Sequence, residues 1–293
     1  MRDRITVALL RALLTGGALG GMAWPALAAS QLTVFGDSYS VPVHGGAPTW
    51  VTQLKDQHAV RNVHDFAKSG AVAADQGTNT FARQIRLWKA AGHPLGDTVV
   101  YLGYNDIDGK QSLNAARAGF QAAINALVAA GATAHGNRLY LVLPHDVGST
   151  PEHNRNASQR SFYRRRTIQW DNFVRSVANH EDAVVIDVFA VIDQVLKNPG
   201  RYGFTNVKTP DHHHSRTTAL YDNFFHFGEH GQAIIAQAVR PRLGRTALVA
   251  SRNAPEQQIA ARPETGTGVV QAAFNDAGRR GTVGIRSGTV GAP

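Results

Sequence analysis

Cysteine is absent from this 293-residue sequence. No disulfide can therefore hold the fold together, and its stability must come from packing. Charged residues make up only 17% of the chain and hydrophobic residues 43%. This composition excludes a chain that is disordered over its whole length, and it is enough for a sizeable core. The length allows one large domain or two small ones.

Three common motifs are also missing, namely a Gly-x-Ser-x-Gly elbow, a phosphate-binding glycine loop and a dinucleotide fingerprint. Their absence disfavours an α/β-hydrolase, an NTPase and a dehydrogenase. His212, His213 and His214 resemble a metal tract. Because consecutive side chains diverge and no cysteine accompanies them, a solvated loop is favoured and neither a metal nor an organic cofactor is predicted.

Acidic residues are outnumbered, since 30 Lys and Arg stand against 21 Asp and Glu and give a net charge of +9. This excess favours an anionic partner, such as a membrane surface with phospholipid head groups or an acidic polysaccharide. The basic residues are scattered apart from Arg164, Arg165 and Arg166. They lack the interleaved aromatic residues of a nucleic-acid module, so no nucleic-acid partner is predicted.

The first 28 residues have the pattern of an export signal. Arg2 and Arg4 precede an apolar stretch over residues 5–23, and residues 26–28 (Ala-Leu-Ala) offer a cleavage site. An uncleaved membrane anchor is the alternative, but glycines and a proline interrupt the segment. We predict export to the periplasm or secretion, with the net charge lowered to about +7 after cleavage.

Two kinds of apolar segment alternate along the chain. Short segments rich in β-branched residues predict buried parallel strands at 31–35, 98–103, 137–144 and 182–188. Amphipathic segments predict helices at 81–92, 113–131, 159–179 and 230–243, and Gly92 and Gly131 are expected to end the first two. Such alternation is typical of a parallel sheet with helices on both faces, whose ligands bind at the carboxyl ends of the strands.

From about residue 251 the composition changes to Gly, Ala, Thr and Arg, and the apolar periodicity disappears. We therefore predict a flexible tail over residues 251–293. One α/β domain over residues 29–250 is expected between the export signal and this tail.

Ser38 comes straight after the first predicted strand. Gly36 allows a tight turn there, and Asp37 is expected to cap the start of a helix. A lone Gly-Asp-Ser triplet is more often a structural turn. If Ser38 is a nucleophile, it needs a base, a group that orients the base, and donors for the oxyanion.

Candidates for these partners occur in three other segments. Asn105 lies just beyond the strand at 98–103, where its side-chain amide could donate to an oxyanion, and the backbone N–H of Gly70 could be a second donor. Asp222 stands four residues before His226, close enough for its carboxylate to fix the imidazole tautomer. Each residue alone is more often structural, and their joint presence is what favours a serine esterase.

The segments "FGDSYS", "FAKSGA", "GYND" and "HFGEHG" resemble, in this order, the four blocks of the GDSL lipase/esterase family, also called SGNH hydrolases. The segment "NPGRYGFTNV" resembles a stretch of the plant-like and bacterial phospholipase branch. The resemblance covers roughly residues 31–245. It implies a three-layer α/β/α flavodoxin-like sandwich with a mostly parallel sheet of about five strands.

The resemblance also implies a role for each candidate residue. Ser38 would be the nucleophile and His226 the general base, with Gly231 five residues later as in the family pattern. Gly70 and Asn105 would join the backbone N–H of Ser38 in the oxyanion hole. No metal or organic cofactor is implied.

The acid that orients the base departs from the family pattern. The family usually has Asp three residues before the His, but Asn223 stands there, the carboxylate is at Asp222, and Phe227 replaces the usual Pro. A bulge or helical turn could bring Asp222 to the imidazole. If Asn223 takes the place instead, the imidazolium loses its charge partner and a weaker dyad remains. We predict Asp222.

The sequence thus predicts an exported serine esterase or lipase that hydrolyses carboxylic esters through an acyl-enzyme, with lipid or short-chain esters as substrates. A carbohydrate O-acetyl esterase or an acyltransferase is the alternative. A second alternative is a non-catalytic lipid- or glycan-binding protein on the same fold. His44, His145 and His230 could line the cleft or lie at the surface.

Overall fold

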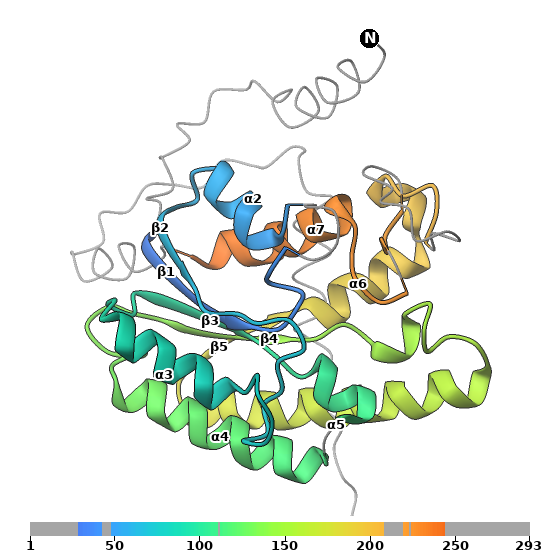
Figure 1. Cartoon of the computed structure of the whole chain (residues 1–293). Coiled ribbons are helices and arrows are strands. Elements are labelled where there is room, and N and C mark those ends of the chain that lie inside the picture. The colour runs from blue at the N-terminus through green and yellow to red at the C-terminus, as the bar shows by residue number, and fades with distance from the viewer. Residues whose placement is uncertain (1–28, 43–47, 111, 208–218, 223, 244–293) are drawn as a thin grey trace, which may run out of the picture.

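The computed structural model describes residues 29–42, 48–110, 112–207, 219–222 and 224–243 (Figure 1). The predicted signal at 1–28, the predicted tail at 251–293 and Asn223 lie outside the described residues, as do His44 and the histidines at 212–214.

Five parallel strands form a single sheet with the order β2-β1-β3-β4-β5. The strands are β1 (Ala29–Gly36), β2 (Val60–Asp65), β3 (Asp97–Tyr101), β4 (Leu139–Leu143) and β5 (Val184–Asp187). Strands β3 and β4 are buried at every position, as parallel strands covered on both faces should be. The predicted fold class and four predicted strands are confirmed.

Strand β2 was not among the segments singled out in the sequence. It is an edge strand with a largely exposed polar pattern, since Arg61, Asn62 and Asp65 face solvent. An edge strand with one free side tolerates such residues. Its sequence therefore lacks the continuous apolar run that identified the other strands.

Helices cover both faces of the sheet. Figure 1 shows α3, α4 and α5 on one face and α2, α6 and α7 on the other. The bounds are α2 (Trp50–Asp56), α3 (Phe81–Ala91), α4 (Leu113–Ala129), α5 (Ala157–His180), α6 (Val188–Lys197) and α7 (Glu229–Val239). Short turns complete the fold at η1 (Asp106–Lys110), η2 (Val147–Ser149), η3 (Pro199–Tyr202) and η4 (Arg240–Arg242). None of the described helices is both long and apolar enough to cross a membrane.

The ends of α3 show why the sequence pattern located it well. Thr80 caps its first turn by accepting a hydrogen bond from the N–H of Arg83, and Gly92 ends it in the left-handed conformation at φ 69°. Helix α6 was missed because it starts directly at the end of β5, with Asp187 as its cap. The apolar run passes from strand to helix without a break in the pattern.

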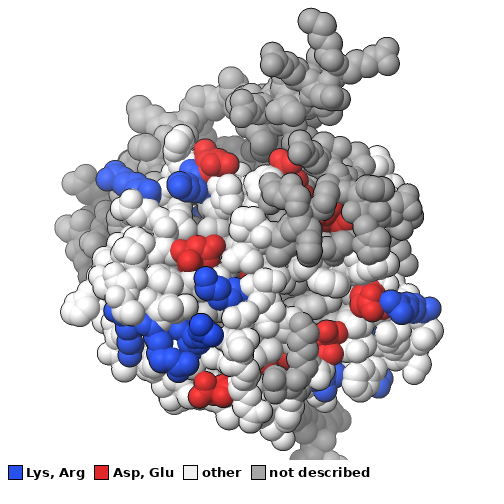
Figure 2. All heavy atoms as spheres, viewed as in Figure 1, with Lys and Arg blue, Asp and Glu red and all other residues white. Residues whose placement is uncertain are grey.

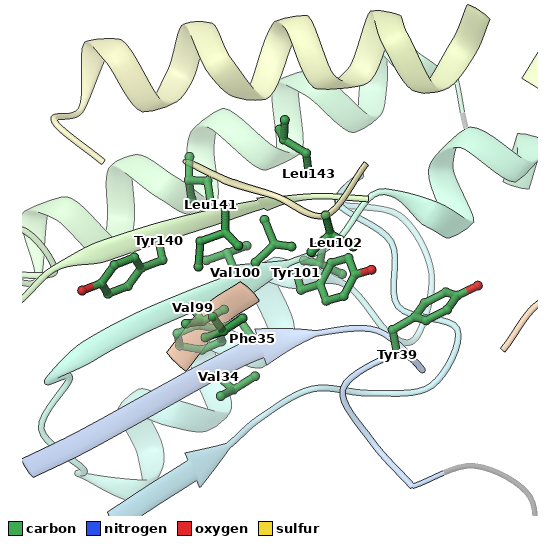
Figure 3. Packing of buried hydrophobic residues seen from close by; sticks show 14 of the residues in the cluster. Val34, Phe35, Tyr39, Val99, Val100, Tyr101, Leu102, Tyr140, Leu141 and Leu143 are labelled. Carbon is green, nitrogen blue, oxygen red and sulfur yellow. The ribbon is translucent and has the colours of Figure 1, made fainter. Parts of the chain in front are cut away.

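The core lies between the sheet and its two helical layers. Figure 3 shows side chains of β1, β3 and β4 packed together, among them Val34, Val99 and Leu141. Tyr39 lies past the end of β1, at the carboxyl edge of the sheet (Figure 3). This edge, where the strands of a parallel sheet place their ligands, carries the candidate site.

Candidate active site

Ser38 lies in a tight turn directly after β1. The side chain of Asp37 accepts a hydrogen bond from the N–H of Tyr39 at 3.0 Å, and its carbonyl accepts from the N–H of Ser40 at 3.1 Å. Residues 37–41 form turns and bends rather than the start of a helix. The expectation that Asp37 caps a helix here is therefore wrong, because its side chain closes a turn onto the residue two positions later.

The end of β1 is fixed by Gln84, which reaches across from α3. Its side-chain oxygen accepts from the N–H of Gly36 at 3.0 Å, and its side-chain nitrogen donates to the carbonyl of Gly36 at 2.7 Å. A Cβ at Gly36 would lie 2.6 Å from Ser40 Oγ and 3.1 Å from the Tyr101 carbonyl oxygen, so a side chain here would force the turn to shift. Gln84 was not among the candidate residues, although a polar residue on the apolar face of Phe81 and Ile85 was a usable signal.

His226 and Ser38 meet although they are 188 positions apart in the sequence. The Nε2 atom of His226 lies 2.9 Å from the Oγ atom of Ser38. Both residues are buried, with 4% and 6% of their surface exposed. This is the hydrogen-bond reach that a base needs to activate a serine hydroxyl.

Asp222 lies opposite His226 in a short antiparallel hairpin. Tyr221 pairs with Phe227, and the N–H of Asp222 donates to the carbonyl of His226 at 2.8 Å. Residues directly opposite each other in such a pair project from the same face, with Cβ atoms about 4.5–5.5 Å apart. A carboxylate that stands four positions, rather than three, before the imidazole fits this hairpin.

Asn105 and Gly70 belong to neighbouring loops that are tied together. The side-chain nitrogen of Asn105 donates to the carbonyl of Ala71 at 2.9 Å, next to Gly70. The carboxylate of Asp106 accepts from the N–H of Ala73 at 3.0 Å. Gly70 is exposed and has φ +71°, a conformation that favours glycine. Because β2, β1 and β3 are adjacent, these loops and the Ser38 turn emerge side by side at one edge of the sheet.

Aromatic rings pack together beside His226, whose ring centroid lies 5.5 Å from that of Tyr39, and we call this set the aromatic floor. The ring centroid of His145 lies 5.6 Å from that of Tyr104 and 4.5 Å from that of Phe227. The members of the set are Tyr39, Tyr104, His145, Tyr221 and Phe227. Burial raises the pKa of the Tyr39 and Tyr104 hydroxyls, which keeps both neutral. Burial lowers the pKa of His145 to about 3, and the neighbouring His226 adds to the shift.

Two aromatic side chains with exposed surface lie on segments that contact the site loops. Phe162 and Phe224 are 47% and 38% exposed. The carbonyl of Phe224 accepts from the N–H of Glu152 at 2.9 Å, which joins the hairpin to the segment before α5. Arg166 stands 5.7 Å from the ring of Phe162 and donates to the carbonyl of Asp106, next to Asn105. Phe162 therefore belongs to a helix that is anchored next to Asn105 through Arg166, and Phe224 belongs to the hairpin that carries His226.

Histidines other than His226 have different surroundings. His145 is fully buried in the aromatic floor, whereas Nε2 of His230 lies 2.7 Å from the carbonyl of Tyr202, on the α7 side of the molecule. His153 pairs with Asp108 at 2.6 Å. Among the described residues, no three His, Asp or Glu side chains gather where they could hold a metal ion.

Comparisons with known proteins point to one family. A model of the GDSL-like Lipase/Acylhydrolase family matches residues 34–234, which is more than half of the chain. No curated protein sequence gives a significant match. Among solved structures, an acetyl xylan esterase superposes with a TM-score of 0.50 at 17% identity, over 72% of this chain and 98% of that one.

Two further solved structures superpose over similar lengths. An acetylxylan esterase from Geobacillus stearothermophilus, a catalytic mutant, has a TM-score of 0.49 at 15% identity, over 72% of this chain and 92% of its own. The lipase/acylhydrolase from Enterococcus faecalis has a TM-score of 0.48 at 16% identity, over 78% of this chain and 100% of its own. At 17% identity, the superposition with the TM-score of 0.50 speaks for the fold alone.

Proposed function

Since the chain belongs to the GDSL-like lipase/acylhydrolase family, we propose that it is a serine esterase that hydrolyses carboxylic esters through an acyl-enzyme on Ser38. The observation that supports this most directly is the distance of 2.9 Å between Ser38 Oγ and His226 Nε2. A hydroxyl within hydrogen-bond reach of an imidazole can lose its proton as it attacks.

In the first half of the proposed reaction, Ser38 Oγ attacks the ester carbonyl while His226 Nε2 takes its proton. Asp222 holds the imidazole tautomer and stabilises the imidazolium. The backbone N–H groups of Ser38 and Gly70 and the side-chain amide of Asn105 donate to the oxyanion. His226 then gives its proton to the leaving alcohol, and the acyl group remains on Ser38.

In the second half, water attacks the acyl-enzyme. His226 takes a proton from the water as its oxygen bonds to the acyl carbon. The bond to Ser38 Oγ then breaks, Ser38 recovers its proton from His226, and the carboxylic acid leaves. An alcohol in place of water would make the same site an acyltransferase. Neither half needs a metal or an organic cofactor.

We further propose lipid or short-chain esters as the substrates. The partly exposed ring of Phe224, two positions before His226, offers apolar surface to an acyl chain beside the site. Figure 2 shows Lys and Arg gathered over the region of α3, where Arg83, Arg86 and Lys89 are exposed. Such a surface favours an anionic membrane as partner. The export pattern of residues 1–28 supports action in the periplasm or outside the cell.

The test is hydrolysis of p-nitrophenyl esters from acetyl to palmitoyl by the wild type, Ser38→Ala and Ser40→Ala. Ser40 is the matched control, because its hydroxyl lies in the same turn and accepts a hydrogen bond from Trp50 Nε1. We expect Ser38→Ala to lower kcat at least about 10³-fold and Ser40→Ala to remain active. Activity that survives in Ser38→Ala would refute the nucleophile assignment.

Chain-length preference separates the candidate substrates. Turnover of long acyl chains supports a lipid esterase, whereas turnover restricted to acetyl esters would favour the carbohydrate O-acetyl esterase. Wild-type protein that neither hydrolyses these esters nor reacts with a fluorophosphonate would refute the enzymatic function and leave the non-catalytic binding protein.

The acid can be tested by comparing neighbouring positions. Asp222→Asn is expected to lower kcat by about 10³-fold or more, because the imidazolium loses its charge partner. Asn223→Ala is expected to lower it less than threefold. The reverse order of these effects would assign the position opposite the imidazole to Asn223.

A further inference from the structure

Tyr39 connects the nucleophile turn to the histidine hairpin at a second point. It follows Ser38 directly, and its hydroxyl donates a hydrogen bond to the backbone carbonyl of Phe225, the residue before His226. Two adjacent hydrogen bonds therefore join the two segments, one between the Ser38 and His226 side chains and one from Tyr39 to the hairpin main chain. The second one holds the backbone from which the imidazole projects.

His145 contacts the same hydroxyl from the other side, with its Nε2 atom 3.3 Å from the Tyr39 oxygen. The tyrosine hydroxyl has one proton, and a carbonyl oxygen can only accept, so this proton is directed to Phe225. The Tyr39 oxygen must then accept from His145. This assigns a hydrogen to Nε2 of His145 and leaves its Nδ1 without one.

The surroundings of His145 agree with this tautomer. Its Nδ1 atom is buried and has no hydrogen-bond partner within the part of the chain that the structure describes. A proton on Nδ1 would therefore have no acceptor. The ring is packed against Phe227 and Tyr104, with centroid distances of 4.5 and 5.6 Å, which keeps Nε2 directed at Tyr39.

We propose that Tyr39 and His145 are positioning residues for the base of the catalytic site. A relay of two hydrogen bonds runs from His145 Nε2–H to the Tyr39 oxygen and from the Tyr39 O–H to the Phe225 carbonyl. It keeps the His226 imidazole at hydrogen-bond distance from Ser38. This inference rests on the proposed esterase function. The relay would matter for catalysis because the reaction rate falls steeply when reacting groups are misplaced.

The first test is Tyr39→Phe, which keeps the buried ring and removes only the hydroxyl. We expect kcat on p-nitrophenyl butyrate to fall at least about 10-fold, since a displaced base costs rate steeply, while KM stays within about threefold. Tyr140→Phe is the matched control, because Tyr140 is another buried tyrosine whose hydroxyl donates to a carbonyl, that of Arg242 at 2.7 Å. Its kcat should change less than about twofold. A Tyr39→Phe enzyme with wild-type kcat would overturn the relay.

The second test changes the donor at position 145. His145→Gln retains a side-chain N–H, whereas His145→Leu has none. We expect the glutamine variant to recover most of the activity that the leucine variant loses. The double variant Tyr39→Phe/His145→Leu should be no slower than Tyr39→Phe alone, because both changes break one relay. Equal losses in the glutamine and leucine variants, or losses that multiply in the double variant, contradict the proposal.

Inactivation by a fluorophosphonate reports the reactivity of Ser38 apart from ester turnover. Its rate constant should fall in Tyr39→Phe by the same factor as kcat and stay unchanged in Tyr140→Phe. If Tyr39 had only a structural role, Tyr39→Phe would lower the stability of the protein and leave this rate constant unchanged. A wild type without esterase activity refutes the proposed function, whereas Ser38-dependent activity that survives Tyr39→Phe refutes only the relay.

Discussion

Asp171 is a buried carboxyl whose replacement is expected to stabilise the protein. It lies on α5, is 6% exposed, and its Oδ1 atom has no hydrogen-bond partner among the described residues. Burial raises its pKa to about 8; Asp187 also raises it, Arg175 opposes the shift, and Asp146 adds a smaller increase. Asp171→Asn keeps the shape of the side chain and removes the ionisable group.

The size of the effect follows from the difference in pKa between the folded and unfolded chains. Between the ordinary value of 3.8 and about 8, the unfolded chain has released the Asp171 proton and the folded chain still holds it. Stability therefore falls as the pH rises through this window, by about 1.4 kcal/mol per pH unit. From pH 5 to pH 7, the variant should gain about 3 kcal/mol on the wild type, against a total stability of about 5–15 kcal/mol for a typical domain.

Urea unfolding at pH 5, 6 and 7, followed by circular dichroism, measures this difference. Asp56→Asn serves as the control, since Asp56 is exposed at the end of α2 and its replacement reports the general effect of removing one negative charge. A difference between Asp171→Asn and the wild type that is the same at pH 5 and pH 7 would refute the assignment of a raised pKa to this carboxyl.

Three further predictions concern the packing around the site. Gly119→Ala is expected to destabilise the protein by about 2 kcal/mol in urea unfolding, because the new Cβ would lie 2.3 Å from the carbonyl oxygen of Ala73. This cost outweighs the higher helix propensity of alanine, and a more stable variant would contradict the prediction. Gln84→Leu removes both hydrogen bonds to Gly36 and should lower the free energy of unfolding by about 1–3 kcal/mol in the same measurement. It should also lower kcat, and an unchanged kcat would show that the position of Ser38 does not depend on these two hydrogen bonds. Because the pKa of His145 is about 3 in the folded chain and about 6.5 when unfolded, the wild type should lose about 2 kcal/mol relative to His145→Gln as the pH falls from 6.5 to 4.5. A difference in urea unfolding between the two proteins that is the same at both pH values would argue against it.

Much of the fold follows from local patterns in the sequence. The continuous apolar runs of β1, β3 and β4 reflect burial on both faces of the sheet, so each could be located without knowledge of its neighbours. Strand β5 lies at an edge and is only partly buried at three of its four positions, and its β-branched residues identified it. The ends of α3 were likewise predictable, because a cap and a stop signal act within one turn. Ser38 could be singled out for the same reason, since a turn straight after a buried strand is a local feature.

Other features depend on contacts between distant residues. The register of the hairpin sets Asp222 opposite His226, and the sequence left this open between a bulge and a helical turn. The folded chain alone brings His226 to 2.9 Å from Ser38 and Tyr39 to the carbonyl of Phe225. Periodicity reports which face of an element is buried and not what covers it. The order of the strands and the path of the loops decide which side chains meet, and these arise only when the whole sheet has assembled.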